Sequence, residues 1–156
     1  MRKVFAILIA IVSVLATSLG GQYFTGRTVS SEWYKCIKPQ WTPPSIVFPI
    51  VWTTLYILIA IAFARILIAD DRIASGVLAV NLVFNIIWCY FFFAAKKPWY
   101  AIPSIVIIWL SIIWLQWHRR KDRIFVALLT PYLLWISFAT VLNLQAALNS
   151  SKKCTK

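Results

Sequence analysis

The chain has 156 residues, of which 62% are hydrophobic and 13% are charged, and its formal net charge at pH 7 is +12. A soluble domain is about 45–50% apolar, so a globule of this length could not bury all of this apolar surface, and we expect lipid to be its solvent. The basic residues stand in short clusters between apolar runs and at both ends, which is typical of loops at anionic headgroups and argues against nucleic-acid binding.

Five apolar runs are each near the ~20 residues that a bilayer demands. The first run, behind Arg2 and Lys3, also resembles a signal peptide, and we interpret it as a retained helix because the later helices need neighbours. The predicted spanning helices cover residues 4–24, 45–68, 73–95, 99–117 and 124–148. We therefore predict an all-α integral membrane protein, a five-transmembrane-helix bundle that forms a single transmembrane domain over residues 1–156.

The longest connection, residues 25–44, carries aromatic and proline residues that a passive linker would not need. It contains Trp33-Tyr34 and the stretch Lys38-Pro39-Gln40-Trp41-Thr42-Pro43-Pro44. Prolines fix φ and so reduce the number of conformations that are lost on ordering. Trp41 is suited to a water–lipid boundary. Because loops of this length are often functional covers, we expect this one to lie over a site.

Charge does not predict which side of the membrane each loop faces. The 16 Lys and Arg residues divide eight and eight between the two sides of the predicted bundle, so the positive-inside rule gives no orientation. The sequence shows no internal repeat, and an inverted-repeat transporter is therefore not supported.

The ionisable side chains lie at the edges of the predicted spans. The four acidic residues all fall in loops or at helix ends: Glu32, Asp70, Asp71 and Asp122. A coupled pump normally carries charge at depth, and a hydrolase needs a buried acid/base pair, so both classes are disfavoured. We interpret the single histidine, His118, as an interfacial polar residue. The three cysteines have no metal-ligand spacing, so we expect unpaired thiols and no metal site: Cys36, Cys89 and Cys154.

Two predicted helices each carry a face of aromatic, amide and small residues at helical spacing. In the third span this face is Asn81, Asn85, Trp88 and Phe92, and in the fifth it is Trp135, Ala139, Asn143 and Ala146. Amides are costly in hydrocarbon, so they should face protein or a cavity. From the pattern alone, both plain helix packing and a ligand pocket remain open.

The collected motifs resemble the translocator protein family, whose members are also called tryptophan-rich sensory proteins or peripheral benzodiazepine receptors. The matching motifs are, in chain order, Trp33-Tyr34 with Lys38–Pro44, Val51-Trp52 with Leu55-Tyr56, Asn85-Ile86-Ile87-Trp88 with Phe92-Phe93, and Leu128-Leu129-Thr130-Pro131-Tyr132-Leu133-Leu134-Trp135 continuing through Phe138-Ala139-Thr140 to Leu142-Asn143. The order and spacing of these motifs make the resemblance specific. The first and fourth predicted helices match the family only in general character, without one of these motifs.

The resemblance implies a five-helix homodimer with a ligand pocket beneath the first loop and no cofactor. Family ligands are porphyrins such as protoporphyrin IX, synthetic isoquinoline carboxamides and benzodiazepines, and cholesterol in mitochondrial members. Carried over motif by motif, the expected pocket residues are Trp52, Asn85, Trp135 and Ala139, with Tyr34, Pro44, Phe48, Tyr56 and Trp88 as neighbours. Trp52 and Trp135 would stack on a flat ligand, Asn85 would supply a hydrogen bond, and Ala139 would leave room.

One part of the sequence departs from the mitochondrial members. Their cholesterol motif needs a Tyr followed by a basic residue late in the fifth helix, and here the Tyr position is Leu144 and the basic position is apolar. Cholesterol recognition by that motif is therefore not expected. The basic, short-tailed chain resembles bacterial members, so we expect a multi-pass protein of a bacterial cell membrane.

Three functions follow from the resemblance. The first is a membrane receptor or binding protein for protoporphyrin IX and similar flat hydrophobic ligands. The second is light- and oxygen-dependent porphyrin degradation, in which case Trp52 and Trp135 would be the catalytic residues. The third is transport of a tetrapyrrole or lipid, although the lack of buried charge argues against ion coupling.

Overall fold

The computed structural model describes residues 2–26 and 28–153, and every regular element in these ranges is helical. Five helices are long and apolar enough to cross a membrane, which confirms the predicted fold class. The elements are α1 (Arg2–Thr25), α2 (Glu32–Ile37), α3 (Val47–Ile68), α4 (Arg72–Cys89) with a π-helical turn η1 (Tyr90–Ala94), α5 (Pro98–His118) and α6 (Arg123–Lys153).

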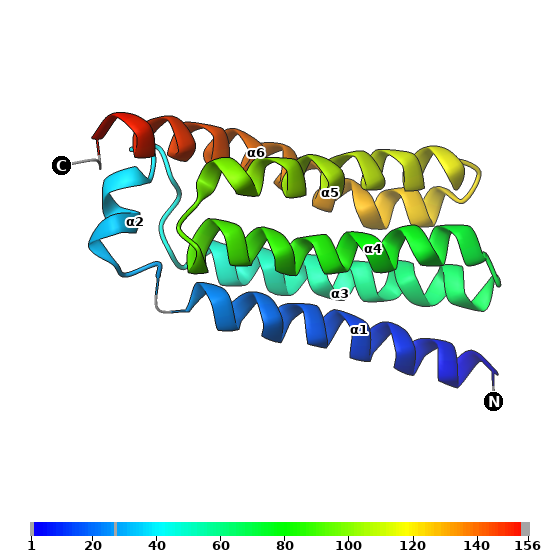
Figure 1. Ribbon diagram of the computed structural model, residues 1–156. Helices are drawn as coiled ribbons and strands as arrows, with labels where there is room; N and C mark the ends of the chain where they lie inside the picture. Colours follow the sequence, from blue (N-terminus) through cyan, green and yellow to red (C-terminus); the bar gives the residue numbers. More distant parts are fainter. Residues whose placement is uncertain (1, 27, 154–156) are drawn as a thin grey trace.

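The five long helices lie side by side along one direction, and the short α2 sits at the end of the bundle remote from the amino terminus (Figure 1). α1 packs against α3 and α4, while α5 packs between α4 and α6. α3 meets α6, and α2 rests on the last turns of α6. The two ends of the chain lie at opposite ends of the bundle (Figure 1).

Two features of the fold differ from the sequence-based prediction. The connection 25–44 contains α2, which begins where the Ser31 side chain accepts a hydrogen bond from the Tyr34 amide at 3.2 Å. Such an N-cap satisfies a donor that the first turn would otherwise leave unpaired. α6 continues to Lys153, past the predicted end at residue 148, because no proline or glycine interrupts its polar last turns. The other helix ends agree within two residues when the π-helical turn η1 is counted with α4.

A hydrogen-bonded relay ties three helices together at the centre of the bundle. Tyr132 of α6 is fully buried, and its hydroxyl donates to Asn81 Oδ1 at 2.9 Å and accepts from Asn85 Nδ2 at 2.8 Å. Asn81 also donates to the Ile108 carbonyl of α5 at 3.1 Å and to Ser111 Oγ at 2.7 Å. Both asparagines of α4 therefore face protein, and the relay fixes the rotation of α4, α5 and α6 about their axes.

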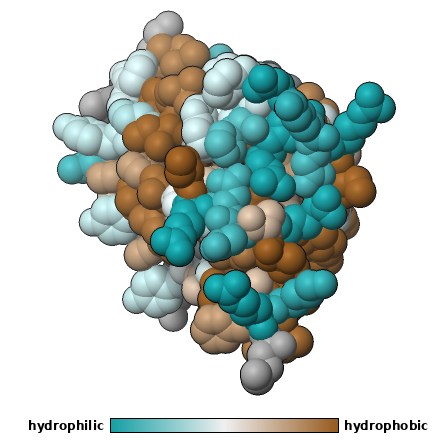
Figure 2. Space-filling view, turned by 90° about the vertical axis from the view of Figure 1, so that its right-hand side faces the viewer, coloured by the Kyte–Doolittle hydropathy of each residue, from teal (hydrophilic) through white to brown (hydrophobic). Residues whose placement is uncertain are grey.

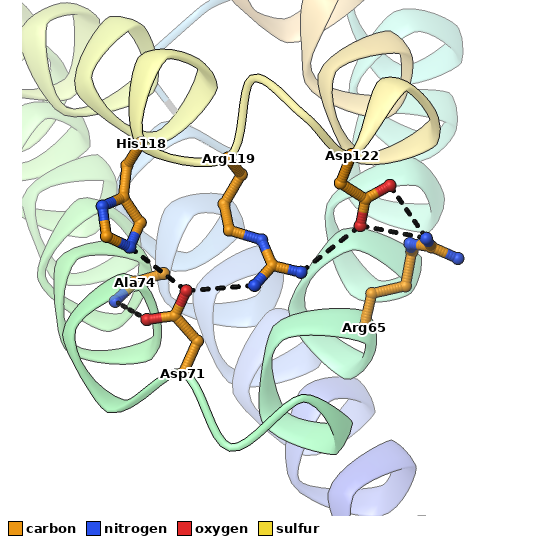
Figure 3. A network of polar contacts seen from close by, with 6 residues as sticks. All are labelled: Arg65, Asp71, Ala74, His118, Arg119 and Asp122. Atoms are coloured by element: carbon orange, nitrogen blue, oxygen red, sulfur yellow. Dashed lines mark hydrogen bonds and ion pairs between the residues drawn. The ribbon is translucent and has the colours of Figure 1, made fainter.

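An ionic cluster joins four helices at the end remote from α2, where hydrophilic residues gather on the surface (Figure 2). Arg119 extends between two carboxylates (Figure 3), donating to Asp71 Oδ2 at 3.2 Å and to Asp122 Oδ2 at 3.4 Å. Arg65 of α3 donates to both oxygens of Asp122 at 2.9 and 3.0 Å, and His118 lies 3.2 Å from Asp71 Oδ2. The cluster thus closes this end of the bundle.

The two carboxylates of the ionic cluster are also the N-caps of their helices. Burial alone would raise the pKa of Asp71, but hydrogen bonds from the Ala74 amide and Arg119 outweigh it, so the pKa lies below its ordinary value. For Asp122, burial is likewise outweighed by the Phe125 amide and Arg65, and the pKa is lowered. Both side chains are therefore held in the charged form by their partners.

Replacing Tyr132 by Phe should destabilise the protein by about 1–2 kcal/mol, because it leaves a buried amide donor and a buried carbonyl without partners. The measurement is the thermal unfolding midpoint in detergent. The control is Tyr100→Phe, since Tyr100 is 63% exposed. Equal midpoints for the two variants would contradict a stabilising relay.

Acid should destabilise the fold through the ionic cluster. Because the pKa values of Asp71 and Asp122 are lowered in the folded state, their contribution is present above the unfolded pKa of about 3.9 and is lost as the pH falls through the folded values below it. Asp122→Asn should lower the unfolding midpoint at pH 7 and flatten its decline below about pH 4. Asp70→Asn is the control, because that side chain is 72% exposed; an equally flattened profile there would refute the assignment.

Candidate ligand-binding site

Aromatic rings line the junction of α3 and α6 at the end of the bundle that carries α2. Phe48 of α3 stands edge-on to Trp135 of α6, with ring centroids 5.7 Å apart. Phe138, on the next turn of α6, lies 5.5 Å from Trp135, and Trp41 of the first loop stands edge-on to Phe138 at 5.9 Å. We call these four residues, drawn from three segments, the aromatic seam.

Trp135 is the one member of the aromatic seam that carries a buried donor without a partner. Other indoles of the bundle are paired: Trp88 Nε1 donates to Asn143 Oδ1 at 2.9 Å, and Trp109 Nε1 donates to Ser137 Oγ at 2.8 Å. Trp135 Nε1 is buried and has no acceptor among the described residues. A ligand with a carbonyl or carboxylate oxygen here would gain a hydrogen bond without displacing an existing one.

Trp52 lies deeper along the same junction, against the hydrogen-bonded relay. Its ring is tilted against Tyr56 at 5.3 Å and edge-on to Tyr132 at 6.4 Å. Asn85 is 2% exposed, and its amide nitrogen is engaged by the Tyr132 hydroxyl. The relay therefore joins the predicted residues Trp52 and Asn85 through Tyr132, which the sequence reasoning did not include among the site residues. The sequence feature that could have identified Tyr132 is its position three residues before Trp135, which places both side chains on the same helical face.

A second aromatic group lies between α4, η1 and α2. Trp88 stacks on Phe92 at 5.4 Å, Trp33 stands edge-on to Phe92 at 6.4 Å, and Tyr34 lies 5.9 Å from Phe93. The π-helical turn, closed by the Ala95 amide on the Tyr90 carbonyl at 2.8 Å, is wider than an α-turn. Phe92 and Phe93, two consecutive rings of η1, can therefore both be buried beside α2.

The first loop is fastened to the bundle by polar contacts as well as by rings. Asn149 of α6 donates to the Ile37 carbonyl at the end of α2, at 2.9 Å. Burial of Tyr34 raises the pKa of its phenol, so this side chain is neutral at ordinary pH. Cys36 is disulfide-bonded, so the expectation of an unpaired thiol was wrong for this residue, whereas Cys89 is free and buried. Cys154 lies outside the described residues.

The structure groups some of the predicted pocket residues and separates others. Phe48 contacts Trp135, Trp52 contacts Tyr56, and Ala139 is buried in the same core cluster as Tyr132. Tyr34 and Trp88 belong to the second aromatic group. Pro44 is exposed in the first loop. No group of three His, Cys, Asp or Glu residues that could hold a metal occurs in the described part of the chain.

Comparison with known proteins shows the family of this chain. A model of the TspO/MBR family matches residues 7–148. The chain belongs to the TspO/MBR family. It is 32% identical over 148 residues to the tryptophan-rich protein TspO of Chlorobaculum tepidum, with 91% of this chain and 94% of that protein covered.

Proteins with other names are also similar to this chain. The tryptophan-rich sensory protein of Cereibacter sphaeroides is 36% identical over 118 residues, with 74% of this chain and 75% of that protein covered. The translocator protein of Bos taurus is 28% identical over 136 residues, with 80% and 78% covered. Family membership and the five spanning helices make this chain a multi-pass membrane protein.

Removing the amide of Asn149 should loosen the first loop. Asn149→Ala deletes the hydrogen bond to the Ile37 carbonyl, so we expect faster hydrogen exchange in residues 32–46, by about tenfold for one hydrogen bond. The measurement is made in reductant, so that the Cys36 disulfide does not hold α2 in place. The control is Ser150→Ala in the same turn, and equal exchange in the two variants would contradict the anchor.

Proposed function

We propose that this protein is a membrane receptor or binding protein for flat hydrophobic ligands, tetrapyrroles such as protoporphyrin IX above all. The proposed site lies at the aromatic seam beneath the first loop. The observation that carries the proposal is the buried indole nitrogen of Trp135, which has no acceptor among the described residues. Synthetic isoquinoline carboxamides and benzodiazepine-type compounds are proposed as further ligands, and a homodimer as the assembled form.

The chemistry of the aromatic seam suits a planar ligand with a polar edge. Ring contacts between Trp135, Phe48 and Phe138 are edge-on or tilted, and a flat ligand could replace them with stacked contacts of larger area. Trp135 Nε1 would donate to an oxygen at the edge of the ligand. Ala139, one turn beyond Trp135, adds little bulk, and Trp52 would form the inner wall against Tyr132.

Binding is favoured over passage through the bundle. The ionic cluster of Arg65, Arg119, Asp71 and Asp122 joins the helix ends remote from α2. A ligand that crossed the bundle lengthwise would have to break these ion pairs. Relatives are named both sensory and translocator proteins, and a closed remote end supports the sensory alternative for this chain.

The test is an absorbance titration of the detergent-purified protein with protoporphyrin IX. Trp135→Phe keeps an aromatic ring and removes the donor, so affinity should fall about tenfold, as expected for one buried hydrogen bond. The control is Trp117→Phe, because Trp117 is 62% exposed at the remote end. No saturable binding by the unaltered protein would refute the function, whereas equal affinities of the two variants would refute only the assignment to Trp135.

Two further experiments distinguish binding from degradation and from transport. Illumination of the complex with and without oxygen tests degradation, for which loss of porphyrin absorbance beyond the protein-free sample is the required result. Ligand flux in proteoliposomes, compared with empty vesicles, tests transport. We expect stable porphyrin spectra and no added flux.

A further inference from the structure

The end of the bundle remote from α2 carries a depression that the proposed porphyrin site does not use. It is lined by five consecutive residues at the turn from α5 to α6, with a volume of about 550 Å³: His118, Arg119, Arg120, Lys121 and Asp122. Figure 2 views this end of the molecule and shows its hydrophilic residues beside apolar ones. The depression is thus a polar hollow at the rim of an apolar bundle.

The acidic groups at this hollow are already committed to partners. Asp122 accepts from Arg65, Arg119 and the Phe125 amide, and Asp71 accepts from Arg119 and the Ala74 amide. Figure 3 shows Arg119 between the two carboxylates, with Arg65 beside Asp122 and Ala74 beside Asp71. The Nε atoms of Arg65 and Arg119 are buried without an acceptor among the described residues. The cluster therefore has donors in excess, and its carboxylates cannot neutralise further cations.

Two cations at the hollow are not neutralised. Arg120 and Lys121 are exposed, and neither forms an ion pair with a described acidic residue, since those acids pair with Arg65, Arg72, Arg119, His118 and Lys35. The Arg120 guanidinium lies over the Trp117 ring, 5.3 Å from its centroid. Trp117 is 62% exposed, as befits a tryptophan at the membrane–water interface. Both cations are therefore placed at the depth of the lipid headgroups.

We propose that this hollow binds the phosphate of an anionic phospholipid. The guanidinium of Arg120 and the ammonium of Lys121 would hold the phosphate oxygens, since basic pockets between spanning helices take anionic headgroups. Exposed apolar side chains of the adjoining first turns, Ile73 at 65% and Ile124 at 60% exposure, supply a surface for the acyl chains. Those side chains distinguish a lipid from a soluble phosphate ion as the occupant.

The test compares two variants with the same change of charge. Arg120→Gln with Lys121→Gln removes two cations at the hollow, while Lys96→Gln with Lys97→Gln removes two adjacent cations from the turn at the opposite end. Lipid-bound protein is counted by native mass spectrometry after addition of phosphatidylglycerol or phosphatidylcholine. We expect one retained phosphatidylglycerol per chain of the unaltered protein. The affinity for this lipid should be about 30-fold lower in the Arg120/Lys121 variant, which is the usual effect of losing two cations that attract anionic lipid at the membrane surface.

Thermal unfolding keeps the test decisive if the variants differ in stability. In phosphatidylcholine both variants should melt close to the unaltered protein, because the two pairs make exposed contacts with aromatic rings and take no part in the ionic cluster. Only the Arg120/Lys121 variant should lose the added stability in phosphatidylglycerol. Equal loss in both variants, or equal retention of phosphatidylcholine, would overturn the proposal. An equal rise in melting temperature with inorganic phosphate would show a site for free anions and would overturn the lipid assignment.

Discussion

The bundle depends on one buried hydroxyl group, that of Tyr132. In a bilayer the hydrophobic effect does not distinguish one helix rotation from another, because lipid tails are as apolar as the side chains they touch. The Tyr132 hydroxyl does distinguish them, since it must meet Asn81 and Asn85 of α4 at the same time. Asn81 extends the constraint to α5 through Ser111 and the Ile108 carbonyl. The relay therefore supplies the specificity that apolar packing in lipid lacks.

Because the hydrogen bonds of Tyr132 fix the rotation of α6, they also determine which side chains of α6 face the neighbouring helices. Trp135, Ala139 and Asn143 follow at helical spacing on the same side. Asn143 accepts from Trp88 of α4 and donates to the Pro98 carbonyl at the start of α5, both at 2.9 Å. Asn149, further along, reaches α2. One helix thus carries the central relay, the aromatic seam and the anchor of the loop above it.

The sequence predicted the parts of this arrangement that repeat with the helical period. Two faces were found by spacing, one with Asn81, Asn85 and Trp88 and one with Ala139 and Asn143. The structure buries all of these side chains except Trp88, which is half-buried. Spacing does not say which residue a polar atom will meet, so the pairing of Asn85 with Tyr132 was not foreseen. α2 was missed because six residues are too few for a periodic signal. The ionic cluster was missed because its five side chains lie at the ends of four different helices.

The two ends of the contact between α3 and α6 resist separation in different ways. At Arg65 and Asp122 the helices are joined by an ion pair in which Nη2 of Arg65 donates to both carboxylate oxygens, and hydrogen bonds of this kind weaken as their angle changes. At Phe48 and Trp135 they are joined by ring contacts alone, and the indole nitrogen has no hydrogen bond to lose. Ring contacts tolerate sliding and re-packing. Separating α3 from α6 at Phe48 and Trp135 would therefore cost no hydrogen bond of these two side chains, whereas separating them at Arg65 and Asp122 would break an ion pair.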